Sequence, residues 1–132
     1  MEKSYRLAKR EDFNKVYRYG KSMANHQFVL YFLAQPKLEH FRLGISVSKK
    51  VGNAVVRNRL RRMIKEIIRL KKDHMTAHYD YILIARKPAA DMEYADMEKS
   101  IFHVIRKASL YKRNETIKKA SNEPAGKKGE RD

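Results

Sequence analysis

The feature that most constrains the fold is a change of hydrophobic period in the middle of the chain. Apolar residues alternate with polar or small ones from Phe41 to Ser48, which is the pattern of a strand with one buried face. From about Asn53 to Lys72 the apolar residues recur every three or four positions, the pattern of a helix that packs one side on a sheet. This strand and helix predict an α/β domain in which helices cover a small sheet.

Shorter patterns on either side complete the predicted order. Residues 10–19 are predicted to form a first helix, which Gly20 ends, and residues 26–35 form a β-rich run. Residues 79–86 are apolar at almost every position, which indicates a strand covered on both faces, and Asp91 is expected to cap a last helix. The order is helix, two or three strands, helix, strand, helix. It predicts an α/β (α+β) sandwich, with a small mixed sheet of about four strands flanked by three helices.

The length and composition fit one domain with a polar tail. The 132 residues allow a single domain of ordinary size, and 42% of them are hydrophobic, which is enough for a core. We expect the domain over residues 1–112 and a solvated tail over residues 113–132, where apolar residues nearly vanish. The longest apolar run, residues 28–34, is too short to span a bilayer, and the first residues lack the apolar stretch of a signal peptide. A cytoplasmic protein without a membrane segment is therefore expected.

Positive charge is concentrated on the central helix and the segment before it. The chain has 31 Lys and Arg residues against 15 Asp and Glu residues, a formal net charge of +16. Residues 49–72 alone contain ten basic side chains and one acidic side chain, Glu66. Exposed helices usually mix acidic and basic side chains. On this helix, a face that only contacted solvent would hold many positive side chains that repel one another. The pattern favours a polyanionic ligand such as nucleic acid.

A helical wheel places most of these bases opposite the apolar stripe. Arg57 and Arg59 instead lie on the two flanks of the stripe, where long side chains reach past the edge of the sheet. The unpaired N–H groups at the start of the helix also attract anions, and Lys49 and Lys50 lie beside them. The candidate nucleic-acid-binding residues are Lys49, Lys50, Asn53, Arg57, Asn58, Arg59, Arg61, Arg62, Lys65 and Arg69.

No group of residues has the spacing of an active site or a metal centre. The chain has no cysteine, which excludes disulfides, thiolate zinc sites and cysteine nucleophiles. His74 and His78 are four residues apart, but no third ligand lies near them in the sequence. Gly52 has no second glycine at the spacing of a nucleotide-binding loop. We therefore predict a binding protein, with no catalytic residue, no bound metal and no small-molecule substrate.

One long segment and several short ones resemble a known family. Residues 46–62, SVSKKVGNAVVRNRLRR, are similar to the signature of the bacterial ribonuclease P protein subunit, whose hallmark is the Arg-Asn-Arg motif at residues 57–59. The resemblance covers about residues 5–112. The other segments that resemble the family are Arg6-Leu7, Asp12-Phe13, Val16-Tyr17, Phe28–Tyr31, Arg42–Ser46 and Asp80–Pro88.

The resemblance implies that residues 1–112 form an RNA-binding subunit of a ribonucleoprotein. In that family a catalytic RNA removes the 5′ leader from precursor tRNA by Mg²⁺-dependent phosphodiester hydrolysis, and the protein itself holds no cofactor. The helix with the Arg-Asn-Arg motif would face the catalytic RNA, with one protein per RNA, and a cleft would hold the single-stranded leader. A left-handed βαβ crossover is also implied, against the usual hand. The implied cleft residues are Phe13, Tyr17, Tyr31, Ser46 and Ser48.

The residues alone leave the aromatic cleft and the function open. Phe13 and Tyr17 share one helix face, so they either form a platform on which bases stack or pack in the core. The buried side of the strand that contains Tyr31 is ambiguous, because residues 26–35 are apolar on both faces. Two other functions are considered, a structural ribosomal RNA-binding protein and a nuclease that acts without RNA.

Overall fold

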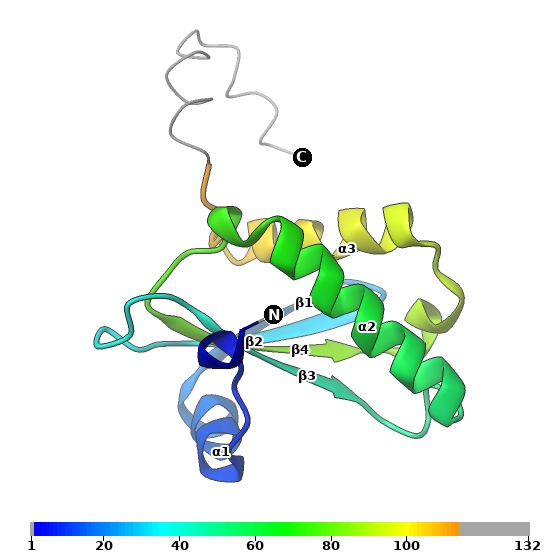
Figure 1. The fold of residues 1–132 in the computed structure, drawn as a ribbon, viewed down its shortest axis with the longest axis horizontal. Helices are drawn as coiled ribbons and strands as arrows, with labels where there is room; N and C mark the ends of the chain where they lie inside the picture. The colour runs from blue at the N-terminus through cyan, green and yellow to red at the C-terminus, as the bar shows by residue number, and fades with distance from the viewer. Residues whose placement is uncertain (1, 114–132) are drawn as a thin grey trace, which may run out of the picture.

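The computed structural model describes residues 2–113 and confirms the predicted element order (Figure 1). These residues contain three α-helices, three short 3-10 helices (labelled η) and four strands. The predicted tail, residues 113–132, lies outside the described residues except for Arg113. In chain order the elements are η1 (Lys3–Tyr5), α1 (Arg10–Tyr19), β1 (Lys21–Ala24), β2 (Phe28–Ala34), β3 (Arg42–Val47), α2 (Ala54–Leu70), η2 (Lys72–His74), β4 (Tyr79–Ala85), η3 (Lys87–Asp91) and α3 (Tyr94–Lys107).

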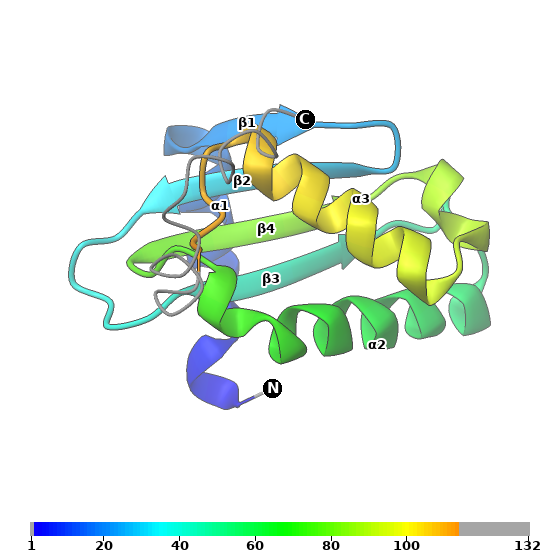
Figure 2. The ribbon, with the colours of Figure 1, turned by 90° about the horizontal axis from the view of Figure 1, so that it is seen from above.

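The strands form a mixed sheet in the order β1–β2–β4–β3. β2 is antiparallel to both β1 and β4, and β3 runs parallel to β4. Figure 2 views the sheet from the side on which α2 lies, and both β3 and β4 run to the right, with β4 above β3 in this view. The chain leaves the right-hand end of β3, returns to the left along α2 in front of the sheet, and then enters β4. This connection is left-handed, as the family resemblance implied and against the usual hand of such crossovers.

The helices cover the two faces of the sheet unequally. α2 and α3 lie on one face and α1 on the other (Figures 1 and 2). The main core lies between the sheet and the two longer helices, where the predicted apolar stripe of α2 is buried. A smaller core of Leu7, Val16 and Ile82 lies under α1. Val29 and Ile84 of the same face are only half-buried, so α1 leaves part of this face open.

The structure adds one strand position and corrects one helix boundary. β1 lies at residues 21–24, where the sequence Lys-Ser-Met-Ala shows no alternation and is mostly exposed at the edge of the sheet. The last helix begins at Tyr94 with Glu93 as its N-cap, so the prediction that Asp91 caps it is wrong. The segment Lys87–Asp91 forms the tight turns of η3, so Pro88 and Asp91 both lie within it.

Candidate RNA-binding surfaces

The turn that leads into α2 holds the first of the predicted RNA-binding residues. Lys49 and Lys50 are exposed in this turn. The Asn53 side chain caps the helix, because its Oδ1 accepts a hydrogen bond from the Val56 N–H at 3.0 Å. The cap satisfies one N–H of the first helical turn, and the positive end of the helix dipole remains beside the two lysines. An anion bound here would reduce the mutual repulsion of all these groups.

The outer face of α2 carries further bases with little acidic compensation. Arg69 donates two hydrogen bonds to the Glu66 carboxylate, at 2.7 and 3.1 Å. Arg61 donates to Asn58 Oδ1 at 3.3 Å, which orients the guanidinium without neutralising it. Within residues 2–113, Arg69 is the one base of this face that forms an ion pair. The predicted bases on this face are Arg61, Arg62, Lys65 and Arg69.

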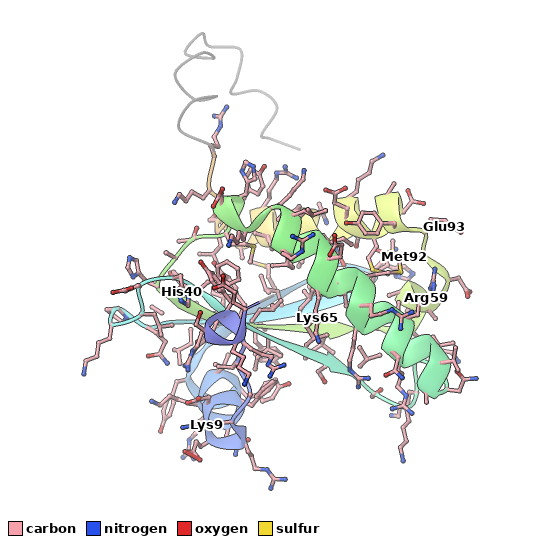
Figure 3. All side chains as sticks on the ribbon, in the orientation of Figure 1. Lys9, His40, Arg59, Lys65, Met92 and Glu93 are labelled. Atoms are coloured by element: carbon pink, nitrogen blue, oxygen red, sulfur yellow. The ribbon has the colours of Figure 1, made fainter. Side chains whose placement is uncertain are left out.

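The two arginines of the Arg-Asn-Arg motif fold back onto backbone carbonyls. The Arg57 Nε–H donates to the Gly52 carbonyl at 3.1 Å. Arg59 donates from Nη1 to the Ala90 carbonyl at 3.4 Å and from Nη2 to the Met92 carbonyl at 3.1 Å. Figure 3 shows Arg59 beside the segment that carries Met92. A guanidinium has five N–H donors, more than these bonds use, so each arginine can still bind a phosphate.

Replacing Arg59 by alanine is expected to lower the stability of the fold. The change removes the hydrogen bonds that tie α2 to η3, which we expect to reduce the free energy of unfolding by about 1–2 kcal/mol. Arg62→Ala, an exposed control on the same helix, should change that free energy by less than about 0.5 kcal/mol. Urea unfolding followed by circular dichroism measures both variants. Equal stabilities would contradict a structural role for the Arg59 side chain.

The second surface lies on the opposite face of the sheet, where α1 meets β2. Phe13 and Tyr17 extend from α1 with their ring centroids 6.4 Å apart. Tyr17 meets Tyr31 of β2 edge to face, with 4.9 Å between the centroids. Tyr17 is 40% exposed, whereas Phe13 and Tyr31 are half-buried at the border of the small core. The structure therefore brings the three predicted aromatic residues together.

Gly44 of β3 allows the Phe13 ring to lie directly on the sheet. A Cβ atom at position 44 would come within 2.5 Å of Phe13 Cζ, so any larger residue would displace the ring. Phe13 consequently packs on the small core with part of its ring, and this supports Tyr17 from below. Phe13 therefore contributes both to the small core and to the aromatic cluster.

The two predicted serines occupy different places. Ser46 lies on β3 beside the Tyr17 phenol and pairs in register with Ile84 of β4. Ser48 is exposed in the turn after β3, where its Oγ accepts a hydrogen bond from the Lys50 N–H at 3.3 Å. Ser46 therefore borders the aromatic cluster, whereas Ser48 lies next to the lysines that lead into α2. The turn after β3 joins the two surfaces.

The Tyr17 phenol is held in its neutral form. Burial raises the pKa of Tyr17, the polar Ser46 hydroxyl beside it lowers that pKa in part, and Tyr31 raises it again. The net effect is a raised pKa for Tyr17, and the ordinary pKa of tyrosine already lies well above neutral pH. The ring can therefore lie against an RNA strand without adding a negative charge to those of the phosphates.

Two apolar residues of this surface were not identified from the sequence. Val29 and Ile84 are partners in register across β2 and β4, and they lie half-buried on the same face as Tyr31. Phe28 and Leu30 point the other way, into the main core. The run that forms β2 is apolar at odd and even positions alike, so its periodicity does not show which residues face α1.

A buried ion pair beside the aromatic cluster was also missed. Arg42 donates from Nε to Asp80 Oδ1 at 2.7 Å and from Nη2 to Oδ2 at 2.8 Å, and this bonding raises the pKa of Arg42. Gln35 Nε2 donates to the same carboxylate at 3.1 Å, and Asp12 of α1 lies 3.5 Å from Arg42 Nη1. The network ties α1 to the sheet. The sequence does contain a signal for this ion pair, because Asp80 lies within a strand predicted to be covered on both faces. A carboxylate buried in such a strand requires a partner.

Neither a metal cluster nor a membrane helix is present in the part of the chain that the structure describes. No three His, Asp or Glu side chains among residues 2–113 lie close enough together to hold a metal ion. No helix between those limits is long and apolar enough to cross a membrane.

Known proteins with similar sequences share one description. A family model described as Ribonuclease P matches residues 1–109. The ribonuclease P protein component of Bacillus velezensis is 54% identical over 114 residues, which cover 86% of this chain and 97% of the relative. The ribonuclease P protein component of Staphylococcus carnosus is 51% identical over 118 residues, which cover 89% of this chain and 100% of the relative.

Solved structures with the same fold carry the same description. The RNase P protein of Staphylococcus aureus matches with a TM-score of 0.76 and 46% identity, over 81% of this chain and 97% of that one. The RNase P protein of Thermotoga maritima matches with a TM-score of 0.72 and 30% identity, over 77% of this chain and 96% of that one. The resemblance that the Arg-Asn-Arg segment indicated is confirmed by sequence and by fold, and this chain belongs to the ribonuclease P protein family.

Proposed function

We propose that this chain is the protein subunit of ribonuclease P and that its two surfaces bind different RNAs. Ribonuclease P is an endoribonuclease that removes the 5′ leader from precursor tRNA, and its catalytic centre lies in the RNA subunit. The observation that carries the proposal is the presence of two unlike surfaces on opposite faces of one sheet, a basic helix face and an aromatic cluster. One protein per catalytic RNA and a cytoplasmic location are parts of the proposal.

The basic face of α2 is assigned to the catalytic RNA. Its bases stand on a rigid helix of 17 residues whose other side is packed in the main core. Such a surface presents charges at fixed spacings, which suits a folded RNA whose phosphates are also fixed in space. Arginine adds bidentate hydrogen bonding to phosphate, which a lysine cannot provide. The turn with Lys49 and Lys50 extends this interface to the start of the helix.

The aromatic cluster is assigned to the single-stranded leader. Single-stranded RNA stacks its bases on aromatic rings, and this binding tolerates different sequences because every base has a π face. Tyr17 offers the exposed ring, Tyr31 and Phe13 support it, and the half-buried Val29 and Ile84 form an apolar floor beside it. The Ser46 hydroxyl is the polar group at the edge of this surface.

Tyr17→Ala and Tyr31→Ala are expected to weaken binding of precursor tRNA to the holoenzyme. A lost stacking contact should cost about 1–2 kcal/mol, which is roughly five- to thirtyfold in affinity. Mature tRNA, which has no leader, should bind the variants as it binds the original holoenzyme. Tyr19→Ala removes an exposed tyrosine of α1 outside the cluster and serves as the control. A similar loss for both tRNAs would refute the assignment.

Reconstitution of the reaction tests the proposed function as a whole. Precursor tRNA is incubated at low Mg²⁺ with the catalytic RNA, with this chain, and with both. We propose that Mg²⁺ serves the RNA-catalysed step and that this chain lowers the concentration needed, because its charge offsets part of the repulsion between the two RNAs. Cleavage at the 5′ end of the mature sequence is expected only when both are present. Cleavage by the chain alone, or association with ribosomes without any effect on cleavage, would contradict the proposal.

A further inference from the structure

The N-terminal arm is fixed to the edge of the sheet through its backbone. The Leu7 N–H donates to the Leu43 carbonyl at 3.0 Å, and Arg6 forms a parallel bridge with Leu43 of β3. The Leu7 side chain is buried in the small core, whereas the Arg6 side chain is exposed. Because the backbone and Leu7 hold the arm in place, the Arg6 guanidinium is not needed for this and can bind a ligand.

Arg6 faces Lys65 of α2 across the free edge of β3. Both side chains line one small hollow, and Leu43 and Ile45 form its apolar wall. Figure 3 looks onto this edge and shows Lys65 between α2 and the strands. β3 is the last strand of the sheet, and its pairing with Leu7 shows that Leu43 turns its backbone toward the free edge. Ile45, two residues on, turns its backbone N–H the same way.

The hollow has the chemistry of an anion site. Two cations of different elements line it, and none of its lining residues is acidic. Neither Arg6 nor Lys65 forms an ion pair with a side chain of residues 2–113. Two like charges held against one hollow repel each other unless an anion lies between them. A phosphate group satisfies both cations and can also accept a hydrogen bond from an edge N–H.

We infer that this hollow binds a phosphodiester of the catalytic RNA and that the N-terminal arm is part of that interface. The inference rests on the proposed function. Lys65 lies on α2 among the bases assigned to the catalytic RNA. The hollow therefore extends that surface from α2 to Arg6 of the N-terminal arm. The aromatic cluster lies on the other face of the sheet, separated from the hollow by the paired arm and by α1.

Salt-dependent binding of the catalytic RNA tests the inference with Arg6→Gln and Lys65→Gln. Each loss of a phosphate contact should reduce the slope of log affinity against log salt by about 0.7–0.9, and affinity at 0.1 M salt by about five- to eightfold. Arg6→Lys should retain most of the slope. Lys37→Gln, an exposed lysine of the β2–β3 turn, is the matched control and should behave as the original chain. Thermal unfolding should be unchanged for Arg6→Gln, because the arm is held by its backbone and by Leu7.

The outcomes separate the inference from the proposed function. Original chain that fails to bind the catalytic RNA would overturn both. Original chain that binds normally, with Arg6→Gln equal to it in affinity and slope, would overturn the inference alone. An effect of Arg6→Gln only on substrates that carry a leader would also overturn it, because the hollow would then belong to the substrate.

Discussion

Arg42→Ala is expected to destabilise the fold more than any other single substitution proposed for this chain. It removes the cation that pairs with Asp80 and leaves a carboxylate whose side chain is only 1% exposed. Removal of one partner of a buried ion pair typically costs about 3–5 kcal/mol, because the remaining charge has lost both its partner and its water. Gln35 would remain as a single neutral donor to the carboxylate, which does not replace a cation.

The reciprocal substitution should be milder. Asp80→Ala leaves Arg42, whose side chain is 24% exposed and lies 3.5 Å from Asp12, so its charge keeps some water and a second acid. Urea unfolding at pH 7, followed by circular dichroism, would compare the two variants with Arg10→Ala, an exposed control on α1. A greater loss for Asp80→Ala than for Arg42→Ala would contradict this account of the ion pair. Since the network holds α1, Arg42→Ala should also weaken leader binding in the folded fraction.

Removing three bases together should nearly abolish assembly with the catalytic RNA at physiological salt. We expect the triple variant Lys50→Gln, Arg61→Gln and Arg62→Gln to lose three phosphate contacts. The slope of log affinity against log salt should then fall by about 2.1–2.7, which corresponds to roughly a 125- to 500-fold loss of affinity at 0.1 M salt. None of the three residues forms an ion pair within residues 2–113, so the fold should keep its stability.

A control of equal net charge decides whether the position of the charges matters. The triple variant Lys37→Gln, Lys87→Gln and Lys99→Gln removes three exposed bases from the β2–β3 turn, η3 and α3. It should bind the catalytic RNA almost as the original chain does. If both triple variants lost affinity equally, the overall charge of +16 would explain the binding, and α2 would have no special role.

The elements that pack on the main core were predictable from the sequence. β3 and α2 each bury one side in that core, so their apolar residues recur with the period of the element. α2 was predicted within two residues of its observed ends, and the buried strand β4 within one. β1 was not located because it joins the sheet through backbone pairing with β2, and its exposed side chains leave no pattern. The left-handed crossover came from the family resemblance alone, since the general rule predicts the opposite hand.

The basic residues of the candidate surfaces could be predicted from the sequence. The contacts that their side chains form could be predicted less well. The bases of α2 could be identified because few acids interrupt them. The carbonyl partners of Arg57 and Arg59 could not, because every residue has a carbonyl and the sequence does not show which ones lie near. The pairing of Arg42 with Asp80 joins residues 38 positions apart, and it follows from the parallel pairing of β3 with β4.

Site-directed cross-linking tests the division of labour between the two surfaces most directly. The chain has no cysteine, so Tyr17→Cys or Arg62→Cys provides a single attachment point for a photoreactive group. Each labelled chain is assembled with the catalytic RNA and precursor tRNA, and the cross-linked nucleotides are mapped. Position 17 should link to the 5′ leader and position 62 to the catalytic RNA. Links from position 17 to the catalytic RNA without any to the leader, or from position 62 to the leader, would contradict the account.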